Sequence, residues 1–297
     1  MSYIEWMPSL YGAVEMGGTK TSCAVGSTPQ DLTDVLTFPT TTPGETLERI
    51  IGYLRDHPVE AVGIASFGPV ELRADHPSYG RITITPKTGW SGSDVVAPVR
   101  GSLAVPVGFD TDVNGAAIGE ARWGAGRELG SFVYVTVGTG IGGGAMVGGN
   151  PIHGLGHPEM GHMSVRSHAN DPFPGDCSIH GGCLEGLASG PAIEARFGLP
   201  GDQLSETDLE QALRLEAFYL GQMMRNLVYT LAPEKVIMGG GVASMPGLLD
   251  AVSESLEEEL GGYPGLEEHG PGFVVPPGLG PLSGLAGGLA LAEAARG

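Results

Sequence analysis

The chain has 297 residues, of which 41% are hydrophobic and only 16% are charged, and it contains 51 glycines. This length predicts about two domains, each able to bury its own core, and the composition excludes a disordered chain. The formal net charge of −19 argues against nucleic acid and anionic membranes as partners, because both are polyanions. An anionic substrate would therefore need backbone N–H groups, a metal ion or one of the lysines Lys20, Lys87 and Lys235.

The N-terminal sequence MSYIEWMPSL has no basic segment followed by an apolar one, and no apolar run approaches the roughly 20 residues of a membrane-spanning helix. We therefore expect a cytoplasmic protein that does not enter a membrane. In a reducing compartment Cys177 and Cys183 are expected to bind metal rather than form a disulfide. Cys23 lies in an alternating strand pattern and is expected to be a small core residue.

The first half of the chain reads as strands and helices in alternation, which favours an α/β fold. Residues 12–25 form an apolar segment, a Gly-Gly-Thr turn and an alternating segment, a pattern typical of a β-hairpin. The elements expected after it are a helix at 46–57, a strand in AVGIASFGPV, a short strand in RITIT, a helix near 93–100, a strand in VPVGFD and a helix in VNGAAIGEARW.

At residue 131 the chain begins again with a strand, a Gly-Thr-Gly turn and a glycine-rich strand. This echo predicts two related α/β lobes with a ligand-binding cleft between them. We expect the first lobe at 1–111, the second at 112–281, and a final helix at 282–297 that packs back on the first lobe. The elements expected in the second lobe are a short helix around 187–196, a long helix at 206–231, the strand KVIM, a triple glycine and a further helix.

Three glycine turns are candidate nucleotide contacts. Gly17-Gly18-Thr19 and Gly138-Thr139-Gly140 each follow an apolar strand, so their backbone N–H groups could converge on a polyphosphate. Either turn alone is explained more simply by the positive φ of a hairpin, and the pairing favours phosphate binding. Neither turn fits the P-loop or Rossmann pattern. Gly239-Gly240-Gly241 permits close approach of a flat ring or phosphate, and a tight strand-to-helix turn explains it equally well.

Carboxylates mark a second candidate site. Asp112 lies at the mouth of a predicted helix just after the strand that ends at Asp110, where α/β proteins place reacting groups. Asn114 follows within one turn. Helix capping is an equally simple explanation for Asp110 or Asp112. It does not explain Glu159 and Glu185, which bracket a segment rich in histidine and cysteine.

That segment contains Cys177-x2-His180-x2-Cys183, three soft ligands within seven residues. A tetrahedral Cys2His2 zinc site is the natural interpretation, and chance clustering of surface histidines with two buried thiols is the alternative. The candidates for the fourth ligand are His153, His157, His162 and His168.

The segments EMGGTKTSCAVG, FDTDVNGAA, VGTGIGGG, HPEMGH, CSIHGGCLEGLASGPAIE and MGGG occur in the order typical of the ROK family of repressors, uncharacterised open reading frames and sugar kinases. The resemblance covers about residues 11–292. ITPKTGW, HPEMGH and the Cys-x2-His-x2-Cys spacing are similar to the bacterial fructokinases of that family. Many members have aspartate two residues before the Gly-Gly-Thr turn, where this chain has Glu15.

The resemblance implies a two-lobed, actin-like ATPase fold of the ribonuclease H type, and ATP-dependent phosphorylation of D-fructose to D-fructose 6-phosphate with Mg²⁺. It implies that Asp112 is the catalytic base and that Asn114, Glu159, His162 and Glu185 meet the sugar hydroxyls. Zinc would be held by His162, Cys177, His180 and Cys183, as a structural clamp on the sugar-reading loop. The nucleotide contacts it implies are Gly17, Gly18, Thr19, Lys20, Gly138, Thr139, Gly140, Gly239, Gly240 and Gly241.

The main alternative activity is that of a glucokinase or broad-specificity hexokinase of the same family. A sugar-sensing regulator or sugar-binding module is the alternative from another class. It is disfavoured by the acidic charge and by the short segment of ten residues before the first strand, which leaves no room for a helix-turn-helix. The resemblance also implies a homodimer.

Overall fold

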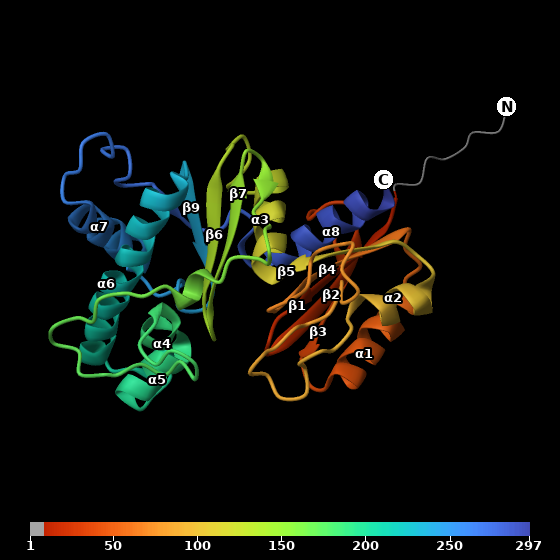
Figure 1. Ribbon diagram of the computed structural model, residues 1–297, viewed down its shortest axis with the longest axis horizontal. Coiled ribbons are helices and arrows are strands. Elements are labelled where there is room, and N and C mark those ends of the chain that lie inside the picture. Colours follow the sequence, from red (N-terminus) through yellow and green to blue (C-terminus); the bar gives the residue numbers. More distant parts are fainter. Residues whose placement is uncertain (1–8) are drawn as a thin grey trace. The chain divides into compact units, whose positions relative to one another are not determined.

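The computed structural model describes residues 9–297 and divides into two compact units (Figure 1). The first, here called unit 1, comprises the chain up to Arg127 together with His153–His157 and Pro281–Gly297. The second, unit 2, comprises Glu128–Ile152 and Pro158–Gly280. Each unit has its own five-stranded sheet.

The sheet of unit 1 has the strand order β3-β2-β1-β4-β5. Strand β2 pairs antiparallel with both β1 and β3, whereas β4 pairs parallel with both β1 and β5. Strands β1 and β2 form the hairpin that the sequence predicts. The strands are β1 (Tyr11–Met16), β2 (Lys20–Gly26), β3 (Thr33–Pro39), β4 (Ala61–Ser66) and β5 (Val107–Thr111).

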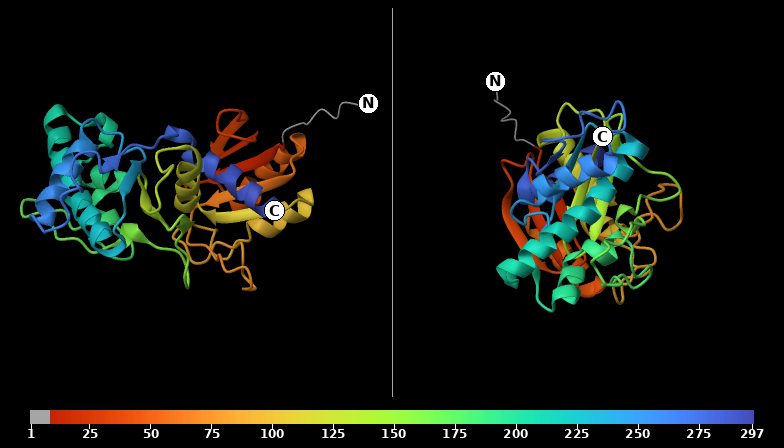
Figure 2. Two further views of the ribbon diagram at one scale, coloured as in Figure 1. Left: turned by 90° about the horizontal axis from the view of Figure 1, so that it is seen from above. Right: turned by 90° about the vertical axis from the view of Figure 1, so that its left-hand side faces the viewer.

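Helices cover both faces of this sheet, because alternate residues of its strands are apolar on both sides. On β1, Val14 and Met16 belong to the core cluster that contains α1 (Pro43–Asp56) and α2 (Val96–Leu103). Tyr11 and Ala13 instead belong to the cluster made with Leu285 and Leu289 of α8 (Ser283–Arg296). Figure 2 shows α8, in blue, running beside the strands of unit 1.

The division between the units lies at 127/128 and differs from the expected boundary at 111/112. Helix α3 (Asp112–Trp123) stays in unit 1 because α8 packs along it. The two helices approach so closely that a Cβ on Gly119 would overlap the carbonyl oxygen of Ser283 and the nitrogen of Gly287. Residues 112–127, expected in the second lobe, therefore share the core of the first.

The sheet of unit 2 repeats the topology of unit 1. Its order is β10-β9-β6-β7-β8, with β7 antiparallel to both β6 and β8, and β9 parallel to both β6 and β10. Both units thus place a hairpin beside a pair of parallel strands in the same arrangement. The strands are β6 (Phe132–Val137), β7 (Ile141–Val147), β8 (Asn150–Pro151), β9 (Lys235–Gly239) and β10 (Val274–Val275).

The helices of unit 2 surround a core dominated by α6. This helix spans Glu206–Leu231, as the sequence predicts. Ser205 is its N-cap, and the Ser205 side chain accepts the N–H of Asp208. Its buried face packs on α7 and on the apolar side of the sheet. The other helices are α4 (Leu184–Ala188), α5 (Gly190–Phe197), α7 (Leu248–Leu260) and the short 3₁₀ helices η1 (Met160–His162), η2 (Gly201–Gln203) and η3 (Gly280–Leu282), the last extending into unit 1.

Three local expectations are wrong. Residues 81–85, predicted as a strand, make only isolated bridges through Arg81 and Ile82, because the segment folds back on itself in a chain of turns. The helix predicted at 187–196 is two helices, since Ser189 ends α4 and caps the N-terminus of α5. The triple glycine leads into a turn, and α7 begins only at Leu248.

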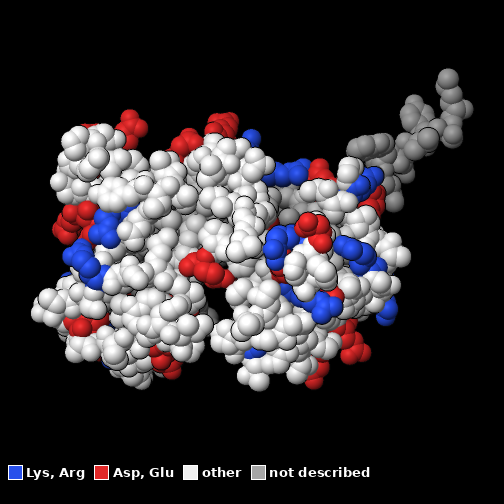
Figure 3. Space-filling model, viewed as in Figure 1, with Lys and Arg blue, Asp and Glu red and all other residues white. Residues whose placement is uncertain are grey.

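Charged side chains are sparse on the face drawn in Figure 3, where acidic and basic groups lie scattered among large uncharged areas. Among the helices of residues 9–297, none combines the length and the apolar character that crossing a bilayer requires.

Candidate active site and metal centre

The Gly-Gly-Thr turn of unit 1 joins β1 to β2 and is held in place by Thr40. The Thr40 hydroxyl donates to the carbonyl oxygen of Gly17 at 2.7 Å, and the Thr40 N–H donates to the carbonyl oxygen of Thr19 at 2.9 Å. Neither glycine of this turn has a positive φ, and a Cβ on Gly18 would meet no atom within 4 Å. The positive-φ explanation of the turn is therefore wrong, and Gly18 leaves an exposed stretch of bare backbone.

Two charged side chains flank this turn. Lys20, the first residue of β2, is exposed. Glu15, on β1, is half-buried, and its burial raises the pKa of the carboxyl group while the nearby Lys20 charge opposes that rise. The Glu15 side chain packs against the first turn of α8, so close that a Cβ on Gly284 would overlap its carboxyl carbon. Unit 1 thus places one carboxyl group, of Glu15, and one amino group, of Lys20, beside the turn.

The Gly-Thr-Gly turn of unit 2 joins β6 to β7 and, like the turn of unit 1, is held by hydrogen bonds from outside the hairpin. Gly138 donates its N–H to the carbonyl oxygen of Gly140 at 2.9 Å, and Gly190, at the start of α5, donates to the carbonyl oxygen of Gly138 at 2.7 Å. The Glu185 carboxylate accepts the N–H of Ile141 at 2.9 Å. Here too neither glycine has a positive φ, so the bare backbone is not required by the turn itself.

The triple glycine adjoins this second turn. Gly240 has a φ of 101°, and a Cβ there would overlap the carbonyl oxygen of Val137 at the end of β6. A Cβ built on Gly138 would lie 3.7 Å from the backbone nitrogen of Gly241. Unit 2 therefore brings together two of the three glycine turns singled out in the sequence.

Asp110, Asp112 and Asn114 gather where β5 runs into α3. The N-cap of α3 is Thr111, whose hydroxyl accepts the N–H of Asn114 at 3.1 Å, so neither aspartate is the cap. Asp112 is the first helical residue, half-buried, with one carboxylate oxygen 2.9 Å from the N–H of Val113. Asp110 is buried and accepts hydrogen bonds from the Asn114 carboxamide at 2.8 Å and from the N–H of Thr111 at 2.7 Å.

Two histidines that the sequence offered as metal ligands lie in unit 1 instead. Nε2 of His153 is 2.9 Å from a carboxylate oxygen of Asp110. Nε2 of His157 accepts the N–H of Val70 at 3.0 Å. His168, a third candidate, lies in unit 2 with its ring against Phe218. Only tertiary contacts distinguish these three side chains from the fourth candidate, because all four share one short stretch of sequence.

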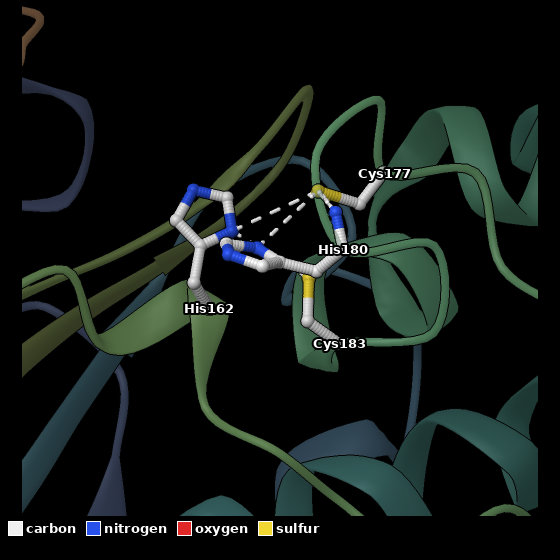
Figure 4. A group of neighbouring side chains, drawn as sticks. All are labelled: His162, Cys177, His180 and Cys183. Carbon is white, nitrogen blue, oxygen red and sulfur yellow. Dashed lines mark hydrogen bonds between the residues drawn. The ribbon is translucent and has the colours of Figure 1, made fainter.

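The fourth candidate, His162, joins the Cys-x2-His-x2-Cys motif in one cluster (Figure 4). The ligand atoms of His162, Cys177, His180 and Cys183 all lie within 4.8 Å of one another. Nδ1 of His162 is 3.5 Å from Sγ of Cys183 and 3.9 Å from Sγ of Cys177, and Nδ1 of His180 is 3.9 Å from Sγ of Cys177.

These separations suit a tetrahedral zinc ion. Zn–S and Zn–N bonds of about 2.3 and 2.0 Å give ligand-to-ligand distances of about 3.3 to 3.8 Å in a tetrahedron. Two thiols and two imidazoles are also a ligand set that magnesium and calcium do not favour. The residues present therefore fit zinc.

Local backbone geometry brings the four ligands together. Cys177 and Gly181 exchange hydrogen bonds at 3.2 and 2.8 Å, closing a tight turn in which Gly181 has a φ of 61°. Leu184, the first residue of α4, donates its N–H to the carbonyl oxygen of Met163 at 3.0 Å, which ties α4 to the segment after η1. Glu159 is exposed at the start of η1 and Glu185 is half-buried on α4, so the two carboxylates stand at the two ends of this segment in the sequence.

Together, the repeated sheet topology, the glycine turns after β1 and β6 and the acidic N-terminus of α3 define a two-unit α/β protein of the actin-like ATPase class, a fold shared with solved ROK sugar kinases. The sequence model of the ROK family matches residues 11–295, and the chain belongs to that family.

Known relatives are similar over nearly the whole chain. A putative fructokinase of Bacillus subtilis (strain 168) is 43% identical over 289 residues, covering 96% of each protein. A fructokinase of Zymomonas mobilis is 42% identical and covers 97% of each. Among solved structures, a ROK family glucokinase from Streptomyces griseus in complex with glucose and AMPPNP has a TM-score of 0.78 and 26% identity, covering 96% of this chain and 100% of that one.

Proposed function

We propose that the protein is an ATP-dependent fructokinase that converts D-fructose to D-fructose 6-phosphate. The observation that carries this proposal is similarity at 42–43% identity to relatives named fructokinases, over at least 96% of this chain. The glucokinase of known structure is also similar in fold, at 26% identity. Membership of a family of sugar kinases supplies the reaction class, and the higher identity favours fructose as the sugar.

In this proposal Asp112 is the catalytic base. It stands at the N-terminus of α3, where its carboxylate is half-buried rather than enclosed. Phosphoryl transfer depends mainly on alignment and charge neutralisation, and the base needs to accept the hydroxyl proton only late in the reaction. An aspartate of ordinary basicity is therefore adequate, provided that it is held at the sugar hydroxyl.

The glycine turns would contact ATP, which would bring Mg²⁺ with it. Thr40 hydrogen-bonds the 17–19 turn of unit 1, and Glu185 accepts the N–H of Ile141 directly after the 138–140 turn of unit 2. Lys20 would add a positive charge beside the first turn, and the 239–241 glycines would face the adenosine. Pre-positioned backbone N–H groups stabilise phosphoryl oxygens without reorganising during the reaction.

We assign sugar recognition to Asn114 in unit 1 and to Glu159, His162 and Glu185 in unit 2. Carboxylates are acceptors for several hydroxyl groups, as a polyhydroxylated substrate requires. His162 directs Nδ1 into the thiol cluster, which leaves Nε2 for the sugar. Zinc held by His162, Cys177, His180 and Cys183 would fix the loop that carries these groups and would take no part in phosphoryl transfer.

A coupled assay of ATP consumption with fructose, glucose, mannose and N-acetylmannosamine tests the proposal. We expect the highest kcat/KM for fructose. A higher value for glucose would identify the protein as a glucokinase or broad hexokinase, whereas sugar binding without turnover would favour the regulator or binding module. We also propose a homodimer, as the family resemblance implies, and light scattering of the purified protein tests it.

A further inference from the structure

A buried carboxylate, Asp110, organises the N-terminus of α3. Its side chain is 4% exposed and accepts hydrogen bonds from three directions, namely from the N–H of Thr111, from Nδ2 of Asn114 and from Nε2 of His153. An ionised carboxylate only accepts, so each of these groups must be the donor. This requirement fixes the carboxamide of Asn114 with its nitrogen toward Asp110, and fixes His153 with a proton on Nε2.

That orientation has a consequence for the other end of the Asn114 carboxamide. Its oxygen, Oδ1, is buried and has no hydrogen-bond partner among residues 9–297. Buried acceptors are normally paired, and an unpaired one is unfavourable. A sugar hydroxyl could donate the hydrogen bond that this oxygen lacks. It could do so only while the hydrogen bond to Asp110 keeps the carboxamide from rotating by 180° and exchanging its oxygen with its nitrogen.

His153 is the member of this group whose charge changes with pH. Its side chain is 40% exposed, in contrast to the buried Asp110. Its Nε2 also lies 3.2 Å from Nδ2 of Asn114, and because both nitrogens donate to Asp110 this is a contact between two donors and not a hydrogen bond. The hydrogen bond to Asp110 and the charge of that carboxylate raise the pKa of His153, and partial burial opposes the rise. Of the elements beside it, β5 contributes the charged Asp110, and α3 contributes the neutral Asn114 and carries Asp112 in its first turn.

We propose that His153 and Asp110 are positioning residues that hold the Asn114 carboxamide, and with it the N-terminus of α3, in the orientation that binds the sugar. The inference rests on the proposed function, which places Asn114 and Asp112 at the sugar. His153 would act through Asp110 and Asn114 and would not itself touch the reacting atoms. Protonated His153 neutralises the buried Asp110, so that its loss would free the carboxylate and the carboxamide to reorient.

The test compares His153→Ala, His153→Gln and a control, His57→Gln. His57 is a second histidine of unit 1 beside an aspartate, 3.6 Å from Asp34, at the end of α1. We expect His153→Ala to lower kcat/KM for fructose by about 10- to 100-fold, because small displacements at a site have effects of this size. The change should lie mainly in the KM for fructose, with the KM for ATP within about twofold of wild type. Glutamine at position 153 restores an N–H donor and should recover most of the loss.

The pH profile separates positioning from mere stability. As pH rises through the folded pKa of His153, which lies above the ordinary 6.5, the proton is lost and kcat/KM for fructose should fall. His153→Gln should lack this decline, and His57→Gln should retain it. Equal kinetics and equal profiles in wild type and both His153 variants would overturn the proposal.

An NMR titration of the His153 ring gives a readout independent of turnover. The pKa should exceed 6.5 in the wild type and should drop in Asp110→Asn. An unshifted wild-type value would contradict the pairing of the two residues. If the wild type phosphorylates no sugar, the proposed function fails, and the effect of His153→Ala on fructose affinity by calorimetry then decides the positioning role separately.

Discussion

Glu185 accepts the backbone N–H of Ile141 at 2.9 Å. A side chain of α4, two residues beyond Cys183 of the thiol cluster, thus holds the first residue after the Gly-Thr-Gly turn. The loop assigned to sugar recognition and the turn assigned to phosphate binding share one carboxylate. A substitution at either end of α4 should therefore affect the binding of both the sugar and ATP.

Two substitutions at Glu185 should separate these roles. Glu185→Gln retains an oxygen that can accept the Ile141 N–H, so the KM for ATP should stay near that of wild type. Loss of the charged acceptor should weaken fructose binding by about tenfold or more, the usual value of a hydrogen bond to a charged group. Glu185→Ala should raise the KM for both substrates. Michaelis constants for fructose and ATP check this, and a Gln variant impaired equally in both would contradict it.

Asp112→Asn should abolish most turnover while leaving binding intact. The amide keeps the size of the carboxylate but cannot accept the hydroxyl proton, and a general base contributes about 10²- to 10⁴-fold to a rate. Asp250→Asn, an exposed aspartate in the first turn of α7, is a matched control and should retain full kcat. Calorimetry with fructose and an ATP analogue measures binding. A kcat near that of wild type for Asp112→Asn would disprove the base assignment.

Alanine substitutions at the glycine turns should divide into two classes. Gly18→Ala meets no atom within 4 Å and Gly138→Ala meets only the nitrogen of Gly241, at an ordinary contact distance of 3.7 Å. Neither needs an unusual φ, so the melting temperature should hardly change while the KM for ATP rises. Gly240→Ala forces a side chain onto a φ of 101° and against the carbonyl oxygen of Val137, and it should destabilise the fold. Thermal melts and ATP kinetics distinguish the classes. An unchanged KM for ATP in both of the first two variants would exclude these turns from phosphate binding.

The purified protein should contain about one zinc ion per chain, since two thiols and two imidazoles bring their ligand atoms within 4.8 Å of one another. Stripping zinc, or the substitution Cys183→Ser, should weaken fructose binding more than ATP binding. A loss of about 2 kcal/mol would lower the melting temperature by roughly 4 to 8 °C.

Cys23→Ser is the control for loss of a thiol. Cys23 is fully buried in β2 and lies outside the four-residue cluster, so the variant should keep its zinc. Elemental analysis and calorimetry provide the measurements. Absence of stoichiometric zinc from the wild type, or unchanged fructose affinity in the stripped protein, would refute the proposal that zinc holds the sugar-binding loop in place.

Features determined by local sequence were predictable. The hairpin around residues 17–19 and the helix Glu206–Leu231 follow from apolar periodicity and from the residues at their ends. The RITIT segment shows the limit of that reasoning, because alternation alone does not supply the neighbouring strand that residues 81–85 lack.

The supporting residues of the candidate site were not predictable in the same way. Thr40 braces a turn 23 residues away in the chain, and His153 reaches an asparagine 39 residues away. Both contacts exist only after the sheet of unit 1 has formed. The sequence singled out the candidate glycines, carboxylates and thiols, whose residue types are unusual in their positions. It did not single out Thr40, and it offered His153 only as a metal ligand.

The return of α8 to unit 1 also bears on how the protein is made. Gly63 of β4 lies so close to α8 that a Cβ there would overlap the carbonyl oxygen of Gly288, so this contact requires small residues on both sides. On the ribosome, α8 emerges only after all of unit 2, so the apolar face around Ala13 and Ala61 must wait uncovered throughout that synthesis. Unit 2, although later in the sequence, can complete its core before unit 1 does. The core of unit 1 can thus close only after its last segment has been made, although its strands are translated first, and stalled chains that end before α8 would be natural targets for chaperones.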